Sequence, residues 1–191
     1  MHKTLISLAA ASAFLVPAAA QAQRSAVLVV DTDRILSECT ACRAASTQIE
    51  SQIASARQRA QALEGQLRTE AQTLEGQVKA LGTRQPDAAL QQKITAFQTK
   101  QQQARTELTN RENQIQSIQA NVQRQIGART VQIAEQVRAR RQASVVLPKQ
   151  SLIAVEAAAD VTGEVLAALN QQLPSVSVTP LPQQQQPAQG R

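Results

Sequence analysis

Residues 74–97 read LEGQVKALGTRQPDAALQQKITAF, and the segment at residues 82–87 in the middle is bounded by glycine and proline. On both sides of this segment, apolar and small residues recur at alternating three- and four-residue steps. Such spacing is typical of the heptads of a coiled coil, and a break rich in glycine and proline is typical of a turn. The sequence therefore predicts two long helices that fold back on each other as an antiparallel hairpin, with its tip near residues 82–87.

The apolar series also predicts where the two helices meet. Before the turn it comprises Ile49, Ile53, Ala56, Ala60, Leu63, Leu67, Ala71, Leu74, Val78 and Leu81, and after the turn Leu90, Ile94, Phe97, Ala104, Leu108, Ile115, Ile118, Val122, Ile126, Ile133 and Val137. Folding the chain at the turn places Leu74 opposite Phe97, but it also places Ala60 opposite Arg111. Small and polar residues bury little apolar area. We therefore expect arms, formed by residues 37–142, that bend or splay.

Short apolar segments flank the arms and predict a small body. The three candidate strands, which are β-branched and too short for helices, are VLVV at residues 27–30, ASVVL at residues 143–147 and SLIAV at residues 151–155. Residues 161–173 have the apolar spacing of a helix, and Asp160 can cap it. Residues 24–36 and 143–173 are thus predicted to form the body of an α+β, mostly α protein. Its exposed sheet edges favour the joining of several chains.

The two ends of the chain are predicted to lie outside this fold. Lys3, an apolar run at residues 5–16, Pro17 and the sequence AQA at residues 20–22 together form a secretory signal peptide, cleaved after Ala22. The alternative, an uncleaved membrane anchor, is disfavoured because a span needs about 20 apolar residues. The tail at residues 174–191 is rich in glutamine and proline, has no apolar pattern, and is predicted to be disordered.

The composition argues against an enzyme. The sequence has no tryptophan or tyrosine, and its one histidine, His2, lies in the predicted signal peptide. The mature chain therefore lacks the commonest general base and the best metal ligand. No catalytic residue, metal site or cofactor is expected.

The only two cysteines, Cys39 and Cys42, form a C-x-x-C motif near the start of the first arm. Thioredoxin-type chemistry is disfavoured because no βαβ pattern surrounds the motif. A zinc site would need two more ligands, and the mature chain has no further cysteine and no histidine. A local disulfide, an intersubunit bridge and two buried thiols remain as alternatives, and export favours some form of disulfide.

The positive charge of the protein is concentrated in the predicted arms. Residues 37–142 contain 15 basic and 9 acidic residues, a net charge of +6, whereas the rest of the mature chain has a net charge of −1. Such a surface can attract nucleic acid, anionic lipid head groups or acidic polypeptides. It can equally serve only to keep long helices soluble, and the charge count leaves both interpretations open.

The segments at the ends of the arms carry a resemblance to a known family. They read VLVVD at residues 27–31, SVVLP at residues 144–148, SLIAV at residues 151–155 and DVTGEVLAALN at residues 160–170. With the signal peptide and the hairpin, this order resembles the Skp (OmpH-like) family of periplasmic chaperones, over residues 27–173. The resemblance implies a homotrimer with a shared β body and three arms around a cavity, which holds unfolded outer-membrane proteins without ATP.

The resemblance predicts surfaces rather than single catalytic positions. The expected oligomer interface comprises Val27, Val29, Val145, Leu147, Ile153 and Val155, and the expected client-facing arm residues are Arg57, Arg68, Lys79, Arg84, Lys93, Phe97 and Lys100. An anionic lipid or lipopolysaccharide surface is a further expected partner, although no motif here matches the family's lipid-binding residues. The cysteine pair and the tail depart from the family pattern.

Two other classes of function are alternatives to a holdase chaperone. A periplasmic structural or adaptor protein would dock a folded partner through the hairpin tip around Arg84, but the segments that flank the arms are too short for the β domains of efflux adaptors. Nucleic-acid binding is disfavoured by export and by the absence of a recognition motif or of base-stacking aromatic residues.

Overall fold

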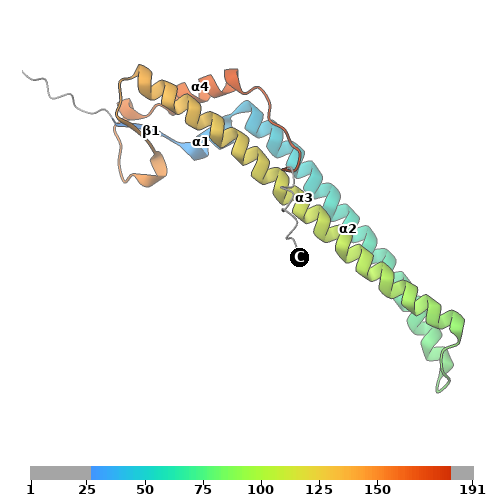
Figure 1. Ribbon diagram of the computed structural model, residues 1–191. Helices are drawn as coiled ribbons and strands as arrows, with labels where there is room; N and C mark the ends of the chain where they lie inside the picture. The colour runs from blue at the N-terminus through green and yellow to red at the C-terminus, as the bar shows by residue number, and fades with distance from the viewer. Residues whose placement is uncertain (1–26, 182–191) are drawn as a thin grey trace, which may run out of the picture.

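The computed structural model describes residues 27–181, which form a long helical hairpin on a small body (Figure 1). The elements are β1 (Val27–Val30), α1 (Thr32–Glu38), α2 (Thr40–Leu81), α3 (Ala88–Arg140), β2 (Val145–Pro148), the 3₁₀ turns η1 (Lys149–Ser151) and η2 (Ala157–Ala159), and α4 (Thr162–Gln172). The predicted mostly helical α+β fold is confirmed. The predicted signal peptide lies outside the described residues.

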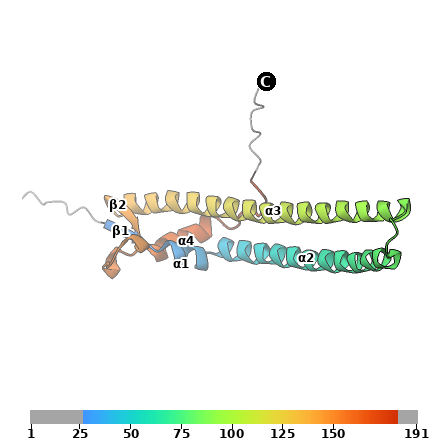
Figure 2. The same ribbon diagram turned by 90° about the horizontal axis from the view of Figure 1, so that it is seen from below.

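The hairpin consists of α2 and α3, which are 42 and 53 residues long and lie side by side in both views (Figures 1 and 2). The turn between them falls at the predicted break. Gly82 ends α2 with a φ of 61°, a conformation that glycine adopts without steric cost. The Asp87 carboxylate then accepts a hydrogen bond of 2.8 Å from the Leu90 N–H and caps α3.

At the other end of the hairpin, α1 is separated from α2 by a kink at Cys39, whose extended backbone has a φ of −66° and a ψ of 138°. Asp31 caps α1 by accepting a hydrogen bond from the Arg34 N–H. The helix begins at Thr32, directly after this cap. The kink was not predicted, because both sides of it have helical spacing.

The sheet contains two parallel strands, with Val27 opposite Val145 and Val30 opposite Pro148. The prediction of a third strand at residues 151–155 is wrong for the single chain. The first of those residues, Ser151, ends the 3₁₀ turn η1, and the others include the wholly exposed Ile153. The second edge of β1 is unavailable to them, since the Val29 carbonyl accepts a hydrogen bond from the Val161 N–H.

The core lies where the body meets the base of the hairpin. Its fully buried side chains come from β1, α1, α4 and the base of α3, and include Val29, Ile35, Ile133, Val137, Val165 and Leu169. Thr162 ties the start of α4 to the end of β1, because its hydroxyl accepts a hydrogen bond of 2.8 Å from the Asp31 N–H. The Asp160 carboxylate accepts from the Thr162 N–H at 2.9 Å, close to its predicted capping role.

Beyond α4, residues 173–181 run along α3 outside any helix or strand, with bends at Pro174 and Thr179, and lead away from the body (Figure 1). We call this segment the strap. The sequence predicted disorder from residue 174 onward, and the strap differs from that prediction because side chains of α3 bind its backbone. The rest of the predicted tail, residues 182–191, lies outside the described part of the chain. Among the described helices, none is long and apolar enough to cross a membrane.

Candidate functional site

The first candidate surface is the seam between α2 and α3, which is only partly closed. A hollow of about 520 Å³ lies between the arms, lined by Ala60, Leu63, Leu67 and Ala71 of α2 and by Phe97, Ala104 and Leu108 of α3. Most of these apolar side chains are half-buried, and Ala104 alone among them is buried. A second hollow of about 410 Å³, lined by Ile53 and Ile115 among others, lies nearer the body. The seam is therefore thin, as the sequence predicted, and its apolar side chains remain accessible.

Two ion pairs cross the seam and hold the arms together. The Arg59 guanidinium donates two hydrogen bonds to the Glu107 carboxylate, at 2.8 and 2.9 Å. Nearer the tip, the Lys100 ammonium lies 2.8 Å from the Glu70 carboxylate. Hydrogen bonding from Arg59 lowers the pKa of Glu107 to about 2, and Arg111 contributes in the same direction. Polar groups thus replace apolar packing in the middle of the arms.

We predict that the Arg59–Glu107 contact weakens in acid. The pKa of Glu107 is depressed from 4.5 to about 2, so its stabilising effect is complete above about pH 4.5 and is lost as the pH falls towards 2. In a carboxyl-carbon NMR titration, Glu107 should titrate near pH 2. In Arg59→Gln its pKa should rise towards 4.5. An unchanged titration in that variant would show that the contact does not persist in solution.

The predicted client-facing cations all lie on the surface of the arms. Arg57, Arg68, Lys79, Arg84, Lys93 and Lys100 are exposed, while Phe97 is half-buried in the seam. Three of the cations form ion pairs with carboxylates of the arms, in the pairs Arg68–Glu64, Lys79–Glu75 and Lys100–Glu70. The other three form no ion pair within residues 27–181. Exposed ion pairs are worth little free energy, so even the paired cations can exchange partners.

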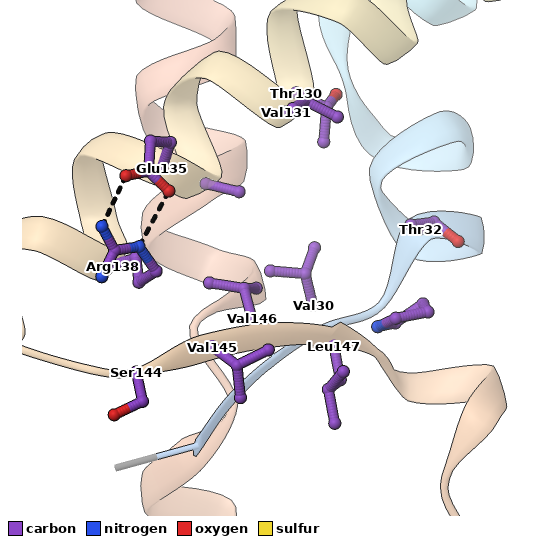
Figure 3. Close-up of a pocket in the computed structure, with 12 residues that line it drawn as sticks. Val30, Thr32, Thr130, Val131, Glu135, Arg138, Ser144, Val145, Val146 and Leu147 are labelled. Carbon is purple, nitrogen blue, oxygen red and sulfur yellow. Dashed lines mark hydrogen bonds and ion pairs between the residues drawn. The ribbon is translucent and has the colours of Figure 1, made fainter. Parts of the chain in front are cut away.

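The second candidate surface is an apolar groove on the body, between β2 and α3, with a volume of about 450 Å³ (Figure 3). Val30 and Val146 point towards α3, whereas Val145 and Leu147 point to the opposite face of the strand. Val131 of α3 lines the groove with 69% of its surface exposed. The ion pair between Glu135 and Arg138 lies at its rim.

The six predicted interface residues differ in how exposed they are in the single chain. Val29 is wholly buried in its own chain, so it is not available to a partner. Val27, Val145 and Ile153 are exposed by 44%, 36% and 108%, and Leu147 and Val155 are half-buried. The sequence did not identify Val131, because a lone valine among polar residues does not stand out in a helix. An apolar surface therefore extends from β2 onto α3.

Cys39 and Cys42 form a local disulfide, which selects one of the three alternatives that the sequence left open. Both residues are buried, and Cys39 sits at the kink between α1 and α2, where its sulfur accepts a hydrogen bond from the Cys42 N–H. The bond therefore joins the body to the base of the first arm. In the described part of the chain, no group of three or more His, Cys, Asp or Glu residues is arranged to hold a metal ion.

Comparisons with known proteins agree with this geometry. The family model described as outer membrane protein (OmpH-like) matches residues 26–169. A crystal structure from Caulobacter crescentus CB15, described as an OmpH-like outer membrane chaperone, superposes with a TM-score of 0.69 at 19% sequence identity. The match covers 84% of this chain and 92% of that one. The comparison with curated proteins gave no match.

Proposed function

Because the chain belongs to the OmpH-like family, we propose that it is an exported chaperone that binds unfolded outer-membrane β-barrel proteins and prevents their aggregation without ATP. The observation that carries this proposal is the open seam of the arms. Half-buried apolar side chains line hollows between two long helices, and exposed cations surround them. An unfolded chain can make many weak contacts along such a surface.

The binding contacts are proposed to be diffuse and partly electrostatic. The arms carry a net charge of +6. Their exposed cations attract acidic segments of an unfolded client by long-range steering, and the seam then supplies apolar contacts. The same charge favours contact with an anionic lipid or lipopolysaccharide surface. Proposed client-facing residues are the six exposed arm cations and Phe97.

Trimerisation through the body is part of the proposal. A two-stranded sheet is marginal by itself, and β2 offers an outer edge beside an apolar groove. The extended backbone at Leu152, with a φ of −119° and a ψ of 142°, leads into the exposed Ile153. We assign this segment, with Val27, Val145, Leu147 and Val155, to contacts between neighbouring chains. A closed ring hides such edges and leaves all the arms on one side.

The proposed site of action is the periplasm, reached by cleavage of the signal peptide after Ala22. The supporting observation is the sequence itself, with its short positive start, apolar run and AQA cleavage site. The disulfide between the two cysteines accords with an oxidising compartment.

We predict that the mature chain suppresses aggregation of a β-barrel protein diluted from urea, and that suppression weakens with salt. Light scattering from the aggregates should fall strongly at three chains per client. This suppression should weaken as the salt concentration rises from 50 to 500 mM, because salt screens exposed charges over a Debye length of about 10 Å at 0.1 M. No suppression at this ratio would refute the proposal.

The unpaired cations provide a matched test of the electrostatic step. R57Q/R84Q/K93Q removes three charges that have no ion-pair partner in residues 27–181. It should weaken client capture about three- to tenfold at low salt and flatten the salt dependence. R68Q/K79Q/K100Q removes the same charge from cations that are already paired, and its effect should be smaller.

A further inference from the structure

The strap is held on α3 by a ladder of hydrogen bonds to its backbone. The Gln125 side chain pairs with Ser177 in both directions, accepting from its N–H at 3.0 Å and donating to its carbonyl at 3.0 Å. The Asn121 amide donates to the Thr179 carbonyl at 2.9 Å, and the Ser117 hydroxyl accepts from the Leu181 N–H at 2.9 Å. Each of these hydrogen bonds is made to the main chain of the strap, and none is made to its side chains.

The spacing of the ladder fits an extended peptide. Its three rungs, Ser117, Asn121 and Gln125, are four residues apart on α3, a rise of about 6 Å at 1.5 Å per residue. The strap residues that they bind are two apart, and two residues of an extended chain rise by about 6.6 Å. One turn of helix therefore matches one two-residue step of an extended segment. The strap itself bends at Thr179, so a straight extended segment can present the same groups to Gln125 and Asn121, and contact with Ser117 requires a bend at the next step.

The side chains of the strap alternate in the same two-residue repeat. Val176 and Val178 are half-buried and pack against the core cluster, which includes Ile118, Val122 and Ile126 of α3. Between and beside them, Ser175, Ser177 and Thr179 are exposed. Such a face selects an extended chain in which apolar and polar residues alternate. Because the polar side chains are exposed, the face does not distinguish one polar residue from another.

We propose that this face of α3 is a binding site for an extended client segment with alternating apolar and polar residues, and that the strap occupies it as an internal competitor. This inference rests on the proposed function, because strands of membrane β-barrels have that alternation. A tethered competitor acts at an effective concentration up to the millimolar range. Only segments that bind more favourably, or at several sites along the arms, displace it.

Release of the strap tests the proposal in the full mature chain. V176D/V178D places two charges against the core cluster and should free the strap while leaving the ladder on α3 unchanged. A fluorescein-labelled peptide with the sequence of residues 173–181 should then bind at least tenfold more tightly to this variant than to the unmodified chain, measured by anisotropy. An unlabelled nine-residue peptide that alternates valine with serine should displace it.

Two further variants control the measurement. Q119D/Q123D adds the same charge at exposed positions of α3 that take no part in the ladder, and its peptide affinity should equal that of the unmodified chain. Adding Gln125→Ala to the released variant should weaken peptide binding at least fivefold, because the two-way contact to the backbone is lost. Circular dichroism checks that each variant is folded.

The outcome separates this proposal from the proposed function. If the released variant binds the labelled peptide no better than the unmodified chain, or if Gln125→Ala has no effect on that binding, the strap is only a structural element and the inference is wrong. If the peptide binds as expected but the mature chain does not suppress client aggregation, the site on α3 stands and the chaperone proposal fails.

Discussion

Replacing Ile153 with aspartate should convert the assembled protein to single chains and abolish most of its suppression of aggregation. The Ile153 side chain is wholly exposed in the single chain, so the substitution removes no contact within it. In the proposed trimer, the same side chain meets a neighbouring body, where a buried, unpaired charge is strongly unfavourable. The mass in solution, measured by light scattering, should fall about threefold.

A matched variant distinguishes this effect from a simple change of charge. Gln150→Asp adds the same charge three residues earlier, on an exposed side chain of η1, and should leave the mass unchanged. Circular dichroism of Ile153→Asp should show the same helix content as the unmodified chain. An Ile153→Asp chain that keeps its mass and its activity would show that the segment after η1 is not an interface.

The second large effect is expected at Leu169, in the C-terminal half of α4. Its side chain is wholly buried in the core at the base of the hairpin, so Leu169→Ala removes packing and leaves a cavity. Such substitutions lower the free energy of unfolding by about 2–5 kcal/mol. Urea denaturation followed by circular dichroism, at one fixed protein concentration, should show a clearly lower midpoint.

A neighbouring leucine provides the control for this prediction. Leu166 is half-buried on the same helix, so Leu166→Ala should have a smaller effect. If Leu169→Ala keeps the midpoint of the unmodified chain, α4 does not contribute to the core of the protein in solution.

The hairpin could be predicted from the sequence because its determinants are local. The apolar spacing and the break at residues 82–87 define two helices, and Asp87 marks where the second begins. The thin seam could also be predicted, since alanine, glutamine and arginine occupy many of the facing positions. No information from distant parts of the chain was needed for either result.

The body was predicted less well because its contacts are distant in the sequence. The run VLVV at β1 is apolar at every position, so it does not indicate that Val29 faces the core of its own chain while Val27 is exposed. Residues 151–155 have the composition of a strand, but the Val161 N–H takes the free edge of β1 that they would need. The composition of residues 151–155 shows that they favour a strand, but it does not show which strand they could pair with.

The strap was missed for a related reason. Its serine, threonine and proline residues are typical of a disordered tail, and between its terminal leucines only two valines interrupt them. What orders it is a set of polar side chains on α3, more than 50 residues away in the sequence. In isolation, neither the strap nor the row of Ser117, Asn121 and Gln125 indicates a binding site.

The central claim, that three chains together hold one unfolded client, is tested most directly by native mass spectrometry of the mature protein with and without an unfolded outer-membrane β-barrel protein. The account predicts a mass of three chains for the protein alone and of three chains plus one client for the complex, formed without added nucleotide. A stable single chain that retains the client, or a trimer that retains none, would contradict it.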